Sequence, residues 1–186
     1  SSDLWATCFS AFTVAGLASI AYLVQRKSVW DTLAVSCVEV GVAFTLVGLA
    51  TGSIWARIIW GIWWTWDARL TWAFITCLVY AGYLMFRRAI DDPTARARLA
   101  AVLCTFGFVS MAITYKSIEW WRTQHPAPVL SFRTGGGSID PAMESAVFSN
   151  IGAMMLLATV FVAVRMRQED LQREIDSLRR YIHATT

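Results

Sequence analysis

The stretch TLAVSCVEVGVAFTLVGLATGSI, at residues 32–54, contains one charged side chain, that of Glu39. A helix needs about 20 predominantly apolar residues to cross the hydrocarbon core of a bilayer. The run is continuously apolar, whereas a strand of a membrane β-barrel alternates apolar and polar residues. We therefore predict a transmembrane helix over residues 32–54, whose backbone satisfies its own hydrogen bonds.

Four similar apolar runs accompany this stretch, at about residues 4–24, 70–86, 99–115 and 146–164. The chain is 56% hydrophobic and 16% charged, whereas an average chain is about 45–50% apolar and 25% charged. These features predict an all-α, polytopic helical membrane protein with five transmembrane helices. The net charge of +3, without a basic stripe, indicates no nucleic-acid partner. The cysteines form no CxxC or CxxCH, which excludes a cysteine-clustered zinc site and covalent haem attachment.

The basic residues between the runs are distributed unequally. One side of the membrane would hold eight: Arg26, Lys27, Arg87, Arg88, Arg96, Arg98, Arg165 and Arg167. The other side would hold five: Arg57, Arg69, Lys116, Arg122 and Arg133. The positive-inside rule therefore places the first set in the cytoplasm. The N-terminus and two loops, at about 55–69 and 116–145, are then expected together on the outer face.

The first of these loops contains WGIWWTWDARLTW, at residues 60–72, with five of the ten tryptophans. One or two indoles near the end of a span are explained by anchoring at the membrane interface. Five in thirteen residues favour a surface for a large flat apolar ligand or for a close partner. Haem is such a ligand, because its faces are apolar, its propionates are anionic and its iron binds imidazole. Arg57 or Arg69 could pair with the propionates.

The second outer loop contains IEWWRTQHPAPVL, at residues 118–130, and brings Trp120, Trp121 and His125 together. Only one other histidine exists, His183, and it is expected on the cytoplasmic side. A lone histidine is usually an ordinary polar residue, but its place beside two tryptophans makes His125 the candidate iron ligand. Glu39 is the one acid well inside a span; such residues are functional candidates by default, and we favour a structural role for it.

The segment 168–186 is charged, unlike the membrane domain at residues 1–167 that precedes it. Leu171, Ile175, Leu178 and Ile182 are spaced 4, 3 and 4 apart, which predicts a narrow apolar seam on a helix. A membrane-surface helix continuing the fifth span is the favoured interpretation. A partner-binding helix of two coiled-coil heptads is the alternative.

The sequence WGIWWTWDARLT resembles the tryptophan-rich (WWD) signature of the haem-handling membrane proteins of c-type cytochrome assembly. The continuation ARLT after Asp67 resembles the haem exporter protein C (CcmC) branch of that family. TGSIW at 51–55, SIEWW at 117–121 and SIDPAM at 138–143 are similar to the same branch. The resemblance extends from about residue 5 to residue 167.

This resemblance implies a protein that is not an enzyme and has no catalytic residues. It would bind b-type haem non-covalently at the periplasmic face of the bacterial inner membrane and deliver it to a CcmE-like haem chaperone. A small membrane subunit and ABC transporter subunits would be further partners. The implied cofactor-binding residues are Trp60, Trp63, Trp64, Trp66, Asp67, Arg69, Trp120, Trp121 and His125, with His125 as the metal ligand. The family pattern has six spans, so a further span and a first axial histidine, directly before Ser1, are expected upstream.

Two other functions remain open at this point. The haem lyase or synthase branch would attach haem covalently to apocytochrome, although its usual Pro-acidic continuation after Asp67 is missing. A membrane scaffold would use the tryptophans to bind a partner protein and no haem. A Soret band in the purified protein separates the scaffold from the other two.

Overall fold

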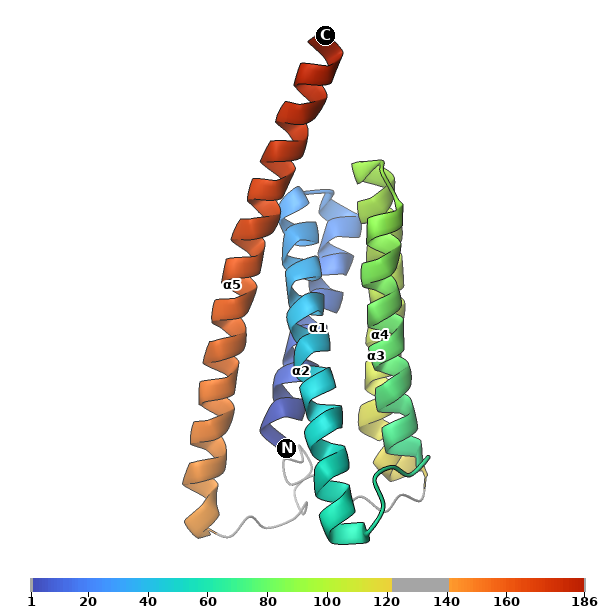
Figure 1. Ribbon diagram of the computed structural model, residues 1–186, viewed down its shortest axis with the longest axis vertical. Coiled ribbons are helices and arrows are strands. Elements are labelled where there is room, and N and C mark those ends of the chain that lie inside the picture. The colour runs from blue at the N-terminus through green and yellow to red at the C-terminus, as the bar shows by residue number, and fades with distance from the viewer. Residues whose placement is uncertain (1, 122–140, 186) are drawn as a thin grey trace.

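The computed structural model describes residues 2–121 and 141–185 and contains five long helices (Figure 1). They are α1 (Ser2–Gln25), α2 (Ser28–Trp60), α3 (Ala68–Ala89), α4 (Pro93–Trp120) and α5 (Pro141–Thr185). Each contains a segment that is long and apolar enough to cross a membrane. The prediction of an all-α, polytopic membrane protein with five transmembrane helices is therefore confirmed.

The helices extend beyond the apolar runs that predicted them. The run 32–54 lies within α2, which continues to Trp60, and the run 99–115 lies within α4. Hydropathy marks only the apolar part of a helix, whereas capping residues determine where the helix begins and ends. Residues 55–60 of the expected outer loop are consequently helical. So are the described residues of the charged tail, which continue α5 without a break.

The core lies where α1 to α4 meet. The rings of Phe12 and Tyr80 stack with their centroids 4.0 Å apart and their planes 3° apart. Gly41 on α2 and Gly107 on α4 lie against these rings: a Cβ atom would be 2.6 Å from Phe12 at the first position and 2.8 Å from Tyr80 at the second. The two glycines therefore permit a close approach of four helices around one aromatic pair. All four cysteines are buried and unpaired, as free thiols.

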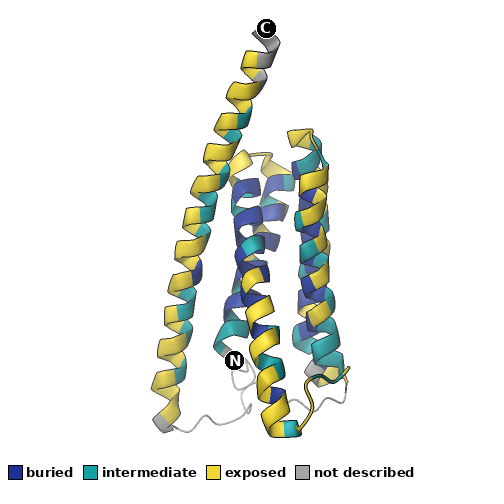
Figure 2. Cartoon of the chain, in the orientation of Figure 1, coloured by how far each residue is buried: buried dark blue, intermediate teal, exposed yellow. Residues whose placement is uncertain are grey.

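The fifth helix lies at the edge of the bundle, against α1 and α2 (Figure 2). Only 6% of its apolar segment is buried, compared with 61% for α2. A cleft of about 510 Å³ separates it from α2, with apolar walls that include Phe44 and Phe161. Glu39 of α2 forms an ion pair with Arg165 of α5 in this cleft. The carboxylate inside the membrane is thus paired between two helices, which is consistent with the structural role that we expected.

Candidate functional site

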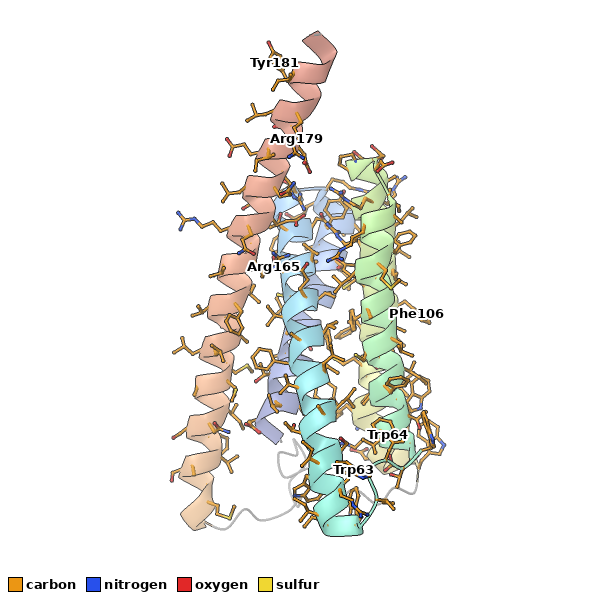
Figure 3. All side chains as sticks on the ribbon, viewed as in Figure 1. Trp63, Trp64, Phe106, Arg165, Arg179 and Tyr181 are labelled. Carbon is orange, nitrogen blue, oxygen red and sulfur yellow. The ribbon has the colours of Figure 1, made fainter. Side chains whose placement is uncertain are left out.

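The tryptophan-rich segment lies at one end of the bundle, together with the last residues of α4 and the start of α1 (Figures 1 and 3). A short connection at residues 61–67 joins α2 to α3. Trp120 is the last residue of α4, and Trp121 follows it directly. The arrangement agrees with the expectation that the two aromatic segments lie on the same side of the membrane.

This connection is fixed at both ends. Gly61 adopts a left-handed conformation, with φ of 76°, and terminates α2. A glycine is favoured there because a side chain would be strained at this φ. The Arg57 guanidinium donates a hydrogen bond to the carbonyl oxygen of Gly61. At the other end, the Asp67 carboxylate accepts a hydrogen bond of 2.9 Å from the backbone N–H of Leu70 and caps α3.

The indoles form edge-to-face groups. Trp55 and Trp60, on the last turns of α2, have ring centroids 5.2 Å apart. Trp64 packs against both Trp66 and Phe74 of α3, at 5.6 and 6.1 Å. Such tilted contacts are the favourable geometry for aromatic pairs. Each group is therefore held in place by ring contacts among its own members, one group on α2 and the other against α3.

Several of these rings nevertheless remain exposed. The exposed fraction is 59% for Trp63, 73% for Trp66, 61% for Trp120 and 47% for Trp121. Trp60 and Trp64 are half-buried, and Trp64 packs against the exposed ring of Trp66. The end of the bundle thus presents a set of large apolar rings to the surroundings.

Arg69 is directed toward α1. Its guanidinium carbon lies 6.0 Å from the centroid of the Trp5 ring, a cation–π distance. The side chain is half-buried on the first turn of α3. Positive charge is therefore placed beside the tryptophans, between α1 and α3. Arg57, by contrast, already donates to the backbone at Gly61.

Two polar atoms of the connection are buried without a hydrogen-bond partner in the described part of the chain. They are the indole nitrogen of Trp64 and the hydroxyl oxygen of Thr65. A buried polar group costs free energy unless it forms a hydrogen bond. Both atoms can donate, so a bound acceptor at this end of the bundle would satisfy them.

His125 lies outside the described residues, so its role as an iron ligand stays a prediction. Among residues 2–121 and 141–185, no three or more His, Cys, Asp or Glu side chains come together as a metal site. Of the nine predicted cofactor-binding residues, the structure describes eight. It gathers those eight at one end of the bundle.

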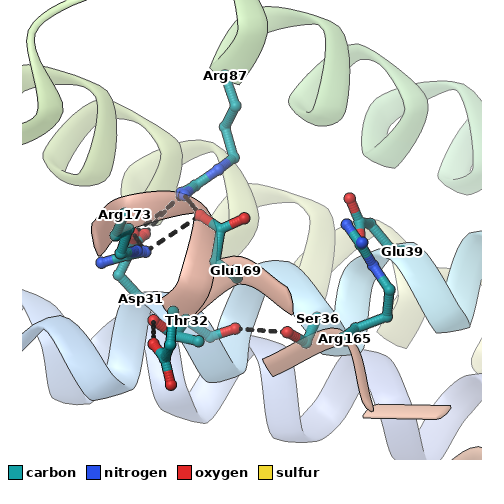
Figure 4. A network of polar contacts seen from close by, with 9 residues as sticks. Asp31, Thr32, Ser36, Glu39, Arg87, Arg165, Glu169 and Arg173 are labelled. Atoms are coloured by element: carbon teal, nitrogen blue, oxygen red, sulfur yellow. Dashed lines mark hydrogen bonds and ion pairs between the residues drawn. The ribbon is translucent and has the colours of Figure 1, made fainter. Parts of the chain in front are cut away.

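A buried polar cluster at the opposite end was not expected from the sequence (Figure 4). Arg87 of α3 donates to both carboxylate oxygens of Asp31 on α2, at 2.6 and 3.0 Å. Arg173 of α5 donates to the same carboxylate at 2.7 Å, and Glu169 lies 3.9 Å from Arg87. Side-chain exposure is 5% for Asp31 and 6% for Arg87. From the sequence, Arg87 was assigned only to a charged loop. The signal that could have revealed the pair is that Asp31 directly precedes one apolar run and Arg87 directly follows another, on the same side of the membrane.

A family model described as "Heme exporter protein C" matches residues 4–181. Proteins of that name are similar to the chain. One from Bradyrhizobium diazoefficiens is 39% identical over 177 residues, covering 95% of this chain and 66% of the relative. One from Escherichia coli K12 is 34% identical over 145 residues, covering 78% and 58%. One from Rhodobacter capsulatus is 33% identical over 163 residues, covering 87% and 67%. The chain therefore spans about three fifths to two thirds of the length of these relatives.

Proposed function

Because the chain belongs to the heme exporter protein C family, we propose that it binds haem at the outer face of a bacterial inner membrane and delivers it for c-type cytochrome assembly. The observation that supports the proposal best is the gathering of exposed indoles, at Trp63, Trp66 and Trp120, at one end of the bundle. Isolated anchoring at the interface does not require rings that pack on one another.

The residues of this end fit the chemistry of haem. Flat apolar rings match the porphyrin faces, and Arg69 supplies a cation for a propionate. The Trp64 indole N–H and the Thr65 hydroxyl, which have no partner in the described residues, are further donors for a carboxylate. The exposed rings of Trp63, Trp66, Trp120 and Trp121 form a tryptophan platform that contacts the ligand. Trp60, Trp64 and Asp67 hold this platform in position.

The iron ligand in this proposal is His125, four residues after Trp121. Binding is non-covalent, as for a b-type haem, because the chain has no CxxCH. The protein's contribution is to bind and orient haem and not to transform it. Transfer to a CcmE-like chaperone, with a small membrane subunit and ABC transporter subunits in the same assembly, belongs to the proposal.

The experiment compares haem binding by two sets of variants of the purified chain. Replacing Trp63 and Trp66 with Ala removes two exposed aromatic contacts, each worth about 0.5–1.5 kcal/mol. The sum of about 1–3 kcal/mol corresponds to a roughly 5- to 150-fold higher Kd. Titration with haem, followed at the Soret band, measures this change.

The matched control is Trp30→Ala. Trp30 lies at the opposite end of α2, where its indole N–H donates to Gln25 at 3.0 Å. Its removal should leave the Kd for haem unchanged. Equal Kd values for the native chain and the Trp63/Trp66 variant would exclude the tryptophan platform and leave only membrane anchoring.

A further inference from the structure

Beyond Arg173, which still contacts Asp31 of the bundle, α5 continues in the direction of the fifth span and extends past the other helices (Figures 1 and 3). At about 1.5 Å per residue, the segment 174–185 is roughly 18 Å long. A helix lying on the membrane surface would turn sideways where the span ends. The structure shows no such turn, since α5 is one unbroken helix from Pro141 to Thr185.

Contacts with α2 and α3 fix the rotation of α5 about its own axis. Arg165 pairs with Glu39, and Arg173 pairs with Asp31 at 2.7 Å. Glu169, midway between them, lies 3.9 Å from Arg87. Residues four apart lie on one face of a helix. The charged face of α5 is consequently turned toward the bundle.

The apolar seam of the tail is turned away from the bundle. At about 100° per residue, Leu171, Ile175 and Leu178 lie roughly 150° around the helix from the charged face. Their exposed fractions are 56%, 44% and 57%. Three large apolar side chains in a row on one outer face indicate a surface that another molecule covers.

The seam follows the heptad spacing within the tail. Positions a are occupied by Gln168, Ile175 and Ile182, and positions d by Leu171 and Leu178. Alternating apolar spacings of 4 and 3 are those of a coiled-coil seam. After the polar Gln168, position a is Ile and position d is Leu. That combination favours a parallel coiled coil of two helices.

The charges beside the seam fit a second copy of the same helix. Glu174 occupies position g and Arg179 the following position e. In a parallel pair these positions face each other across the interface, so each Glu174 would meet Arg179 of the second copy. Two copies inserted in one membrane have the same orientation, which makes their α5 helices parallel.

We propose that the C-terminal part of α5 is a dimerisation helix, and that its seam at Leu171, Ile175 and Leu178 packs against the same seam of a second copy. The contacts of Arg165, Glu169 and Arg173 with the bundle hold the seam outward for this purpose. The proposal depends on neither haem binding nor the sidedness of the membrane insertion.

Disulfide cross-linking of the full chain in its membrane tests the proposal. Ile175→Cys and Leu178→Cys should each give a covalent homodimer under mild oxidation. Ser177→Cys is the matched control, since Ser177 is exposed and lies on another face of the same turn. It should give no dimer. The four native cysteines are buried, so the unaltered chain should give none either.

Charge reversal gives a second readout at positions that are exposed and outside the core. In the Leu178→Cys background, Glu174→Arg and Arg179→Glu should each lower the dimer yield, and the double reversal should restore it. Equal cross-linking at positions 175, 177 and 178 would overturn the proposal. So would a cross-link from the seam to a different polypeptide, or the absence of any cross-link at positions 175 and 178.

Discussion

Asp67 lies within the tryptophan-rich sequence, yet its carboxylate acts on the backbone. It accepts a hydrogen bond from the N–H of Leu70 and begins α3. This capping fixes the direction in which the short connection, residues 61–67, enters α3. It thereby positions Trp64 and Trp66 against Phe74. The residue is best understood as positioning the platform, because asparagine and serine cap helices about as well as aspartate.

Substitution at Asp67 should separate capping from charge. Asp67→Ala should destabilise the protein by about 0.5–2 kcal/mol and weaken haem binding, because the connection loses its anchor. Asp67→Asn should change both properties little. A thiol reagent that fluoresces as the four buried cysteines become accessible on heating measures the stability, and a haem titration measures the binding.

The matched control is Asp92→Ala. Asp92 caps α4 at the other end of the bundle, accepting from the N–H of Ala95 at 2.6 Å. This variant should lose a similar amount of stability and keep its haem affinity. If Asp67→Asn weakens haem binding as much as Asp67→Ala, the carboxylate contacts the ligand or a partner directly, and the positioning account is wrong.

The number and type of the elements could be predicted from apolar runs, because a membrane span requires about 20 apolar residues. The ends of the elements could not. The prediction that the tryptophan loop begins at about residue 55 is wrong: α2 continues to Trp60 and ends at Gly61, whose left-handed φ terminates it. Aromatic and polar residues remain helical until a capping residue intervenes, and hydropathy does not detect caps.

The polar cluster around Asp31 shows a second limit of what could be predicted from the sequence. Arg87 and Arg173 reach Asp31 from two other helices, and 56 residues separate Asp31 from Arg87. Charge patterning within one helix reveals pairs three or four residues apart. Pairs between helices depend on how the helices pack, which the pattern of one chain does not specify. The gathering of the tryptophans was predictable because topology alone brings both aromatic segments to one side.

The packing of the helices can be tested at a glycine. Gly41→Ala should destabilise the bundle by about 1–3 kcal/mol. The added Cβ would lie 2.6 Å from Phe12, whose ring is stacked on Tyr80 and has no room to move. Thermal exposure of the buried cysteines measures the loss.

Gly82→Ala provides the control, since nothing lies within 4 Å of an added Cβ on that residue of α3. Its stability should be unchanged or higher by about 0.5–1 kcal/mol, because alanine favours a helix. A Gly41→Ala variant as stable as Gly82→Ala would show that α1 and α2 are not in the close contact described here.

At the scale of the whole molecule, the bundle has two chemically different ends. The tryptophans lie at one end, and the Asp31 cluster and the α5 extension lie at the other. Basic residues are more numerous around the second end, and we therefore propose that this end faces the cytoplasm. In that proposed orientation the haem site would face the periplasm, where c-type cytochromes receive haem in the proposed pathway.

Cysteine labelling tests this orientation. Ile62→Cys, in the exposed connection between α2 and α3, should react with a membrane-impermeant maleimide on intact cells from which the outer membrane has been removed. Asp91→Cys, in the exposed turn before α4, should react only after the membrane is permeabilised. The buried native cysteines keep the background low. Labelling of the Asp91→Cys variant from outside would reverse the topology.

The central claim is that haem binds at the tryptophan end with His125 as its iron ligand, and a Soret titration of three purified proteins tests it most directly. The native chain should give a Soret band that saturates with added haem. His125→Ala should lose that band and recover it with added imidazole, whereas His183→Ala, which removes the other histidine, should behave like the native chain. A native chain without a saturable Soret band, or a His125→Ala variant that titrates like the native chain, would contradict the account.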